Sequence, residues 1–330
     1  MQRLEGLLRS SLHLRLSNIR PHKNQKSSLA VLFSGGLDCT VLARLAHDLH
    51  PPEQSIDLLN VAFENPRAHR GHTPEDAYEL CPDRVTGRAS YAELERVCPR
   101  RQWNFIAVNV PYTETMEHKQ RVIALMHPHN TEMDLSIAYA LYFAARGAGV
   151  SSPAAGASAV PMTTSAKVLL SGLGADELFG GYQRHATAYD RRGIDGLLDE
   201  LDLDIGRLGK RNLGRDDRVI SDWGREVRFP FLDEKLLAWA LAASVSEKCG
   251  FGECAEVKLD SRDESELLEP GKKVLRCLAW RLGMKDVAKE KKRAVSAHCS
   301  RDVAELTWTR YNLVRARRRW RRARQRVHMC

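Results

Sequence analysis

The segment Leu29–Asp38 reads Leu-Ala-Val-Leu-Phe-Ser-Gly-Gly-Leu-Asp, and it decides both the predicted fold and the predicted chemistry. A short apolar run that leads directly into two glycines is typical of a buried parallel strand that ends in a tight turn. Residues 39–49 then carry apolar side chains at helical spacing, so the turn opens a helix. Free N–H groups and the helix dipole at that point favour an anion such as phosphate.

An acid in this turn adds a metal ion to the prediction. Asp38 would be repelled by a phosphate unless a divalent cation lay between them. The predicted pyrophosphate and Mg²⁺ site therefore consists of Ser34, Gly35, Gly36 and Asp38. Because the loop lacks the Gly-Lys-Ser/Thr ending of a Walker A motif, we expect ATP to be attacked at its α-phosphorus with loss of pyrophosphate. The alternative is an ordinary strand–turn–helix whose glycines serve only the turn.

A second stretch repeats this arrangement farther along the chain. Residues 167–170, Lys-Val-Leu-Leu, are expected to form a strand, and residues 171–182 follow as Ser-Gly-Leu-Gly-Ala-Asp-Glu-Leu-Phe-Gly-Gly-Tyr. A lone acid after a glycine turn is usually a helix cap. Two acids in the same context favour a shared role, so Asp38 and Asp176 are predicted to ligate one Mg²⁺ that bridges the phosphates of ATP.

Strands and helices alternate along most of the chain, which predicts an α/β fold with a doubly wound parallel sheet and ligands at the carboxyl ends of its strands. Strands are expected at residues 29–33, 56–63, 104–110 and 167–170, and helices at 1–16, 39–49, 91–97 and 131–146. Residues 147–165 are rich in Ala, Ser, Gly and Pro and are predicted to be an exposed loop. Beyond residue 181 the pattern is helical, which gives the fold a helical C-terminal half.

Composition and charge exclude several classes of protein. No apolar run approaches the roughly 18 residues of a membrane span, and arginines interrupt the N-terminal leucines, so no signal peptide is expected. The eight scattered cysteines favour a reduced compartment. We therefore expect a cytoplasmic protein with no membrane partner.

The net charge of +9 comes from the C-terminal end of the chain. Residues 310–330 hold nine arginines and no acid, and the remaining 42 basic residues balance the 42 acidic ones. The body is therefore not expected to bind nucleic acid. We expect residues 310–330 to form a disordered basic tail, with RNA or a membrane surface as its alternative partner.

Three motifs point to a known family. Residues 34–38, 172–182 and 228–233 resemble the signatures of the asparagine synthetase C-terminal domain family, an N-type ATP pyrophosphatase with an adenine nucleotide alpha hydrolase-like fold. The resemblance extends from about residue 1 to about residue 306. A eukaryotic branch of the family, the asparagine synthetase domain-containing proteins, is similar in four further stretches, at residues 57–63, 82–89, 212–220 and 292–294.

The resemblance implies a two-step reaction and assigns the residues that support it. ATP would adenylate the β-carboxylate of aspartate, giving β-aspartyl-AMP and pyrophosphate, and ammonia would attack this intermediate. The backbones of Leu32 and Val61 would hold adenine, Ser171 and Gly172 would lie beside the ribose, and Asp176 would complete the metal site. The expected catalytic set is Asp38, Asp176, Lys292 and Arg293, while spacing alone does not rank Lys272 and Lys273 against the last two.

The resemblance also implies a division of the chain. Residues 1–27 correspond to an inter-domain helix and linker, and residues 28–309 to the ATP pyrophosphatase domain. Family members of full length begin with a glutaminase domain, whereas residue 2 here is Gln2. The expected nitrogen source is free ammonia, or glutamine-derived ammonia from a separate glutaminase domain or subunit, unless the sequence is a piece of a longer chain.

Two departures from the family pattern affect the predicted activity. Leu173 occupies the position of a glutamate that is expected to help set the adenylation of aspartate, and Cys39 replaces a serine that would donate to phosphate. A catalytically weak or inactive nucleotide-binding scaffold is therefore the alternative to an asparagine-forming ligase. Arg228 and Asp233 suit a structural turn as well as a substrate-facing wall, and His127, His129 and Asp134 are expected to be surface or capping groups.

Overall fold

The computed structural model describes residues 1–20, 27–66, 71, 73–152, 158–252, 256–258 and 265–291. A seven-stranded sheet with the order β5-β4-β3-β2-β1-β6-β7 lies at its centre. The strands of this sheet are β1 (Ser27–Leu32), β2 (Ser55–Phe63), β3 (Trp103–Val110), β4 (Ala148–Ser151), β5 (Val160–Thr163), β6 (Val168–Leu170) and β7 (Glu226–Arg228). A separate two-stranded sheet pairs β8 (Glu256–Lys258) with β9 (Ser265–Leu267).

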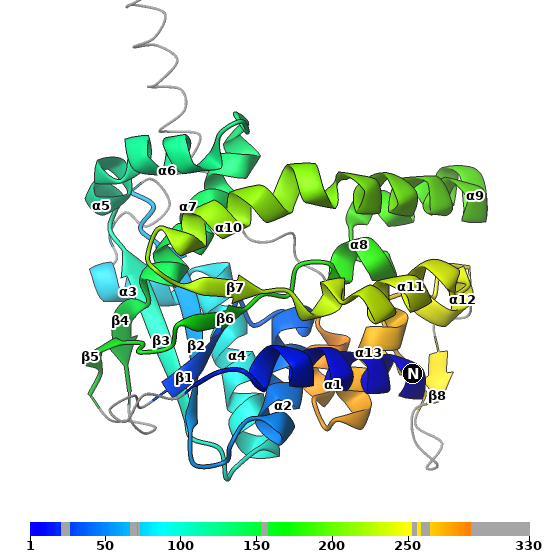
Figure 1. The fold of residues 1–330 in the computed structure, drawn as a ribbon, viewed down its shortest axis with the longest axis horizontal. Helices are drawn as coiled ribbons and strands as arrows, with labels where there is room; N and C mark the ends of the chain where they lie inside the picture. Colours follow the sequence, from blue (N-terminus) through cyan, green and yellow to red (C-terminus); the bar gives the residue numbers. More distant parts are fainter. Residues whose placement is uncertain are drawn as a thin grey trace, which may run out of the picture.

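Helices cover both faces of the main sheet (Figure 1). The first half of the described chain contributes α1 (Gln2–Leu16), α2 (Leu37–Leu49), α3 (Pro74–Glu79), α4 (Pro82–Val97), α5 (Tyr112–Glu117), α6 (Lys119–Met126) and α7 (Glu132–Arg146). The second half contributes α8 (Ala175–Phe179), α9 (Gln183–Leu208), α10 (Gly214–Ser221), α11 (Glu234–Ala242), α12 (Val245–Lys248), α13 (Lys273–Arg281) and α14 (Lys285–Lys289). A π-helical turn (Gly209–Leu213) and a 3₁₀ turn (Pro230–Leu232) complete the described elements. The prediction of an α/β fold with a helical C-terminal half is confirmed.

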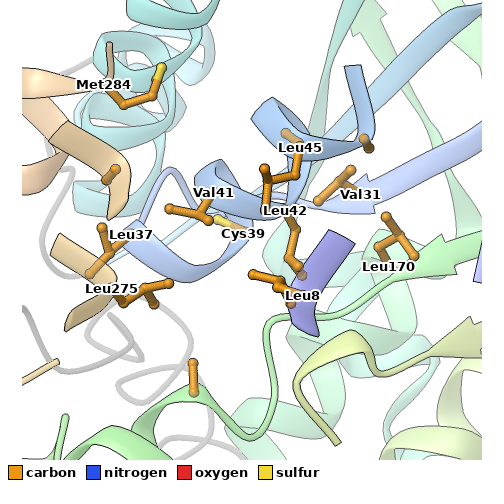
Figure 2. Packing of buried hydrophobic residues seen from close by; sticks show 14 of the residues in the cluster. Leu8, Val31, Leu37, Cys39, Val41, Leu42, Leu45, Leu170, Leu275 and Met284 are labelled. Carbon is orange, nitrogen blue, oxygen red and sulfur yellow. The ribbon is translucent and has the colours of Figure 1, made fainter. Parts of the chain in front are cut away.

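Alternation along β1 explains why the sheet is buried on both sides. Leu29, Val31 and Phe33 point into a core cluster that includes α1, α2 and α13, whereas Ala30 points into a second cluster that includes α7 and α10. Figure 2 shows the first cluster around α2, with Leu8 of α1 and Leu170 of β6 packed against it. The core therefore fixes the strand that carries the first glycine loop from both faces.

Parallel pairing places the functional loops at one edge of the sheet. β1 pairs in parallel with β2 and with β6, and β6 pairs in parallel with β7. Val31 lies opposite Leu170, so the loops that begin at Ser34 and Ser171 leave neighbouring strands at nearly the same level. The carboxyl edge predicted from the strand–helix alternation is the edge that carries both loops.

Three local predictions differ from the structure. Within the stretch 147–165, β4 and β5 pair antiparallel, which extends the sheet at one edge instead of leaving an exposed loop. Short edge strands with small residues show little apolar alternation, so their pattern resembles that of a loop. The helical half beyond residue 181 contains β7, whose three residues are too few to show periodicity. The helix expected at 91–97 begins earlier, because Pro82 occupies a first-turn position that proline tolerates.

The N-terminal helix is part of the core. Leu4, Leu8 and Leu12 of α1 are fully buried in the first cluster, and the Ser11 hydroxyl donates to the carbonyl of Pro230 at 2.6 Å. No helix among the described residues combines the length and the apolar character that crossing a bilayer requires. The basic stretch 310–330 lies outside the described residues.

Candidate functional site

The two acids predicted to share a cation converge on one point. Asp38 lies in the first turn of α2, and Asp176 lies in the first turn of α8. Between them the ammonium of Lys272 donates to both carboxylate oxygens of Asp38 at 2.8 Å and to Oδ1 of Asp176 at 2.7 Å. The Lys272 side chain is 5% exposed, whereas those of Asp38 and Asp176 are 19% and 15% exposed. One cationic group therefore joins the two loops at the partly open edge of the sheet.

Close backbone packing makes this convergence possible. A Cβ added to Gly172 would lie 2.9 Å from the Cβ of Asp38, and one added to Gly181 would lie 1.9 Å from Oδ1 of Asp176. A side chain at position 172 would push the second loop away from the first, and one at position 181 would displace the Asp176 carboxylate and the Lys272 stem. The glycines of the second motif thus allow the approach of the two acids, besides forming the turn.

Lys272 is held in place by the backbone around it. Its φ of +59° lies in the left-handed region, where Lys272 is the sole non-glycine residue of the described chain. Its N–H donates to the carbonyl of Phe179 at 2.8 Å, at the end of α8. Burial lowers the pKa of Lys272, but the charges of Asp176 and Asp38 outweigh burial, so the pKa is raised and the ammonium stays charged.

Arg276 links the Lys272 turn to the end of α14. Its Nε donates to the carbonyl of Gly271 at 3.0 Å, and its Nη1 donates to the carbonyls of Ala288 at 2.8 Å and Glu290 at 2.7 Å. The Arg276 residue is 2% exposed, so these bonds are shielded from water. We call this set of contacts the Arg276 clamp. It fixes the residue before Lys272 relative to the last described helix.

The first loop turns at Gly35 and leads directly into the N-terminus of α2. Gly35 has a φ of +84°, and Gly36 caps the N-terminus of α2. The Gly36 carbonyl accepts from the Thr40 hydroxyl at 2.8 Å and from the Cys39 thiol at 3.2 Å. Burial raises the pKa of the Cys39 thiol, so the group stays protonated below the loop. Figure 2 places Cys39 among the apolar residues of the core.

Four further residues predicted to contact the nucleotide, Leu32, Val61, Ser171 and Gly172, lie on strands β1 and β2 or at the end of β6. Leu32 and Val61 are half-buried on neighbouring strands. Ser171 is buried, and its hydroxyl accepts from the N–H of Leu173 at 3.3 Å. Gly172 and Leu173 are half-buried. Lys292 and Arg293 lie outside the described residues, which end at Lys291 in this part of the chain.

Arg228 and Asp233 serve the turn that docks α1. Arg228 donates to the carbonyl of Arg15 and to the Asn18 side chain, and Asp233 pairs with the Arg15 guanidinium at 3.1 Å. Asp233 also caps α11 by accepting from the N–H of Lys235. These contacts favour the structural reading that the sequence left open.

Sequence reasoning treated Asp134 as a capping group, and it has a second role. It accepts through its side chain from the Thr131 hydroxyl at the start of α7 and from Nη1 of Arg215 at 2.7 Å. Arg215 also bonds Asp216 at 2.9 Å, and all three groups are buried. Burial raises the pKa of Asp216 to about 6, although the Arg215 charge opposes this shift. Two buried carboxylates thus share one guanidinium.

A pH-dependent stability follows from the burial of Asp216. Because the folded pKa of Asp216 exceeds its unfolded value, unfolding releases a proton between pH 4 and pH 6, and the free energy of unfolding falls as pH rises. The expected loss is about 2–3 kcal/mol, since one pKa unit corresponds to about 1.4 kcal/mol. Urea titrations at pH 4.5 and 7 should show that Asp216→Asn removes most of this fall. The control Asp217→Asn changes an exposed neighbour and should leave the slope intact.

The donor set at the sheet edge fits a hard divalent cation. Asp38 and Asp176 supply carboxylate oxygens that already converge on one positive group. In the described part of the chain, no group of three or more His, Cys, Asp or Glu side chains could hold a metal. Two protein carboxylates with the remaining ligands from phosphate and water is the arrangement that Mg²⁺ commonly adopts with nucleotides.

Comparison with known proteins identifies related sequences. The asparagine synthase family model matches residues 160–200 and 189–325, which include the second loop and Lys272. Asparagine synthetase domain-containing protein 1 of Bos taurus is 40% identical over 262 residues, covering 70% of this chain and 41% of that protein. The protein of the same name from Homo sapiens is 38% identical over 255 residues, covering 68% and 39%.

A further relative carries an enzyme name. Asparagine synthetase B, glutamine-hydrolysing, of Escherichia coli is 37% identical over 87 residues, covering 26% of this chain and 15% of that protein. The chain therefore spans less than half the length of these relatives.

Proposed function

Because the chain belongs to the asparagine synthase family, we propose that it is an ATP-dependent amide ligase that activates a carboxylate as an acyl-adenylate. The observation that carries this proposal is the meeting of Asp38 and Asp176 on one cation beside a glycine loop at a helix N-terminus. The family resemblance implies aspartate as the acceptor, ATP and Mg²⁺ as the other requirements, and ammonia as the nitrogen donor. A separate glutaminase domain or subunit would supply that ammonia from glutamine.

The first step would take place above the first loop. A carboxylate oxygen of the acceptor attacks the α-phosphorus of ATP, and the bond from that phosphorus to the pyrophosphate oxygen breaks. Of the loop residues Ser34, Gly35 and Gly36, Ser34 is exposed, Gly36 is half-buried at the N-terminus of α2, and Gly35 is buried beneath them, so the departing pyrophosphate would meet the loop at Ser34 and Gly36. Mg²⁺, held by Asp38 and Asp176, would neutralise the phosphate charge when bound.

Lys272 would supply a second positive charge at this point. The charges of Asp176 and Asp38 raise the pKa of its ammonium, which therefore stays protonated. The backbone hydrogen bond from the Lys272 N–H to the Phe179 carbonyl keeps the residue at the sheet edge. Charge that develops on the phosphate oxygens during attack is stabilised by such a fixed cation. Spacing left four candidate cations unranked, and Lys272 is proposed for this role because its ammonium contacts both acids.

The second step would release AMP. The lone pair of ammonia attacks the acyl carbon, the bond from that carbon to the AMP oxygen breaks, and the amide forms after loss of a proton. We propose no residue as the base, since Lys292 and Arg293 lie outside the described residues.

The experiment that tests this proposal measures pyrophosphate release from ATP and Mg²⁺ with a panel of carboxylate acceptors and ammonium. Aspartate-dependent release, with AMP formed in equal amount, supports the ligase. The matched control is Asp38→Asn, which keeps the size of the side chain and removes its charge. No release with any acceptor, together with ATP-dependent thermal stabilisation, would favour a nucleotide-binding scaffold, the alternative that Leu173 supports.

Leu173 offers a direct test of acceptor chemistry. Its side chain is apolar and half-buried beside Ser171, so it can neither accept a proton nor orient a substrate ammonium. We expect Leu173→Glu to raise aspartate-dependent pyrophosphate release by at least about tenfold, within the range of a positioned acid or base. Leu173→Gln matches the size without the charge and should give no such gain. An unchanged rate in the glutamate variant would contradict this account of Leu173.

A further inference from the structure

The first glycine loop rests directly on α4. A Cβ added to Gly35 would lie 2.5 Å from the backbone nitrogen of Gly87 and 2.6 Å from its Cα. Gly87 belongs to the stretch 82–89, one of the four that resemble a eukaryotic branch of the family, and the proposed reaction gives that stretch no role. Two glycines face each other, so the loop and the helix touch backbone to backbone.

Asn60 joins the same helix to the strand that carries the loop. Its side-chain nitrogen donates to the carbonyls of Phe33 and Asp83, both at 2.9 Å, and its oxygen accepts from Nε of Arg84 at 2.7 Å. Phe33 is the residue immediately before the loop, and Arg84 is fully buried in α4. The end of β1 and the first turns of α4 are therefore fixed to each other by a buried polar network.

Ser90 reaches the loop itself. Its hydroxyl donates to the carbonyl of Gly35 at 2.6 Å, and the residue is 4% exposed. In a trans peptide the C=O of Gly35 and the N–H of Gly36 point in opposite directions. With its carbonyl directed into α4, this peptide directs the Gly36 N–H to the opposite, exposed side of the loop, where it donates to the Ser34 hydroxyl at 3.4 Å, an acceptor that a bound phosphate oxygen would replace.

We propose that Ser90 is a positioning residue for phosphate binding: it sets the orientation of the Gly35–Gly36 peptide so that the Gly36 N–H faces the anion. This inference rests on the proposed function, since it assumes that the loop binds the phosphates of ATP. Glycines flank the peptide on both sides, so little steric hindrance opposes its rotation. The Ser90 hydroxyl opposes that rotation, and the brace formed by Asn60, Arg84 and Gly87 keeps Ser90 within reach.

The test compares Ser90→Ala and Ser90→Thr with wild type in the full chain. Binding of inorganic pyrophosphate in the presence of Mg²⁺ is measured by calorimetry, and thermal melting is measured without ligand. The alanine variant should bind pyrophosphate about tenfold more weakly, because the Gly36 N–H would lose its hydrogen bond to the charged phosphate. The threonine variant keeps the hydroxyl and should recover most of the affinity.

The matched control is Ser11→Ala. The Ser11 hydroxyl is also fully buried and donates to a carbonyl at 2.6 Å, but its acceptor is Pro230 in the turn that docks α1. We expect this variant to lower the melting temperature without changing the pyrophosphate affinity.

Three results would overturn the inference. The first is wild-type affinity in Ser90→Ala, and the second is an equal loss of affinity in Ser11→Ala. If Ser90→Ala does not fold, Ser90→Cys takes its place, because a thiol keeps the size of the side chain but is a weaker donor. Wild-type pyrophosphate affinity in Ser90→Cys is the third result. A wild-type chain that binds neither pyrophosphate nor ATP would instead refute the proposed function, and the inference would fall with it.

Discussion

Lys272→Met is expected to reduce ATP-dependent pyrophosphate release by at least about 100-fold, the loss typical for removal of one charge-stabilising donor. The variant keeps the length and the apolar stem of the side chain but removes the ammonium that lies 2.7–2.8 Å from Asp38 and Asp176. The decrease should appear in kcat, because the ammonium is proposed to act on charge that develops during attack. Steady-state assays with varied ATP separate kcat from KM.

The same variant should be less stable, because two partly buried carboxylates lose their shared cation. We expect a loss of about 2 kcal/mol in the free energy of unfolding. Millimolar Mg²⁺ should then raise the melting temperature of the variant more than that of wild type, since the carboxylate pair can accept a divalent ion in place of the ammonium. This reading does not depend on activity.

Lys248→Met is the matched control for both effects. Lys248 is also 5% exposed, but its ammonium donates to the carbonyl of Ala240 at 2.7 Å, at the junction of α11 and α12. The control should lose stability without a decrease in kcat, and Mg²⁺ should raise its melting temperature no more than it raises that of wild type. An equal decrease of kcat in both variants would show that Lys272 acts only through folding.

Gly35→Ala is expected to give the second large effect, on folding and on ATP binding together. The φ of +84° disfavours any side chain, and the new Cβ would lie 2.5 Å from the backbone of Gly87. Since backbone atoms cannot rotate away, either α4 or the loop must move. We expect a loss of about 3 kcal/mol of stability and no detectable ATP-dependent shift in melting temperature.

Gly224→Ala is the control that separates the cost of a left-handed backbone conformation from the cost of a steric clash. Gly224 has a φ of +66°, but no atom of the described residues lies within 4 Å of a Cβ built there. It follows α10, in the turn before β7. This control should lose about 1 kcal/mol, the contribution of the backbone conformation alone, and should retain its response to ATP. Equal losses in the two variants would contradict the close contact between Gly35 and Gly87.

The sequence was sufficient to predict the sheet edge and the meeting of its two acids. Each acid follows an apolar strand and a glycine turn, and parallel strands align such turns at one edge. The strand, the turn and the acid are neighbours in the sequence, so they can be recognised without knowing how the elements pack. The position of Lys272 is different, because it lies 234 residues from Asp38 and its approach depends on how α13 packs. The spacing of residues along the sequence does not show which side chains so far apart in the chain come into contact.

The support of the first loop was equally hidden from sequence patterns. Ser90 is a polar residue within a helix and Asn60 is a polar residue within a strand. The sequence pattern around them predicts those elements but not the contacts that the two side chains make. Their contacts become visible only when α4 is placed against β2. The one available signal was Gly87, a glycine inside a helical pattern, which often marks a close backbone approach.

The Arg276 clamp has a mechanical consequence. Arg276 bonds the carbonyl before Lys272 and two carbonyls at the end of α14, so one buried side chain joins the start of α13 to the end of α14. We therefore expect a displacement of α14 to change the position of the Lys272 ammonium between Asp38 and Asp176.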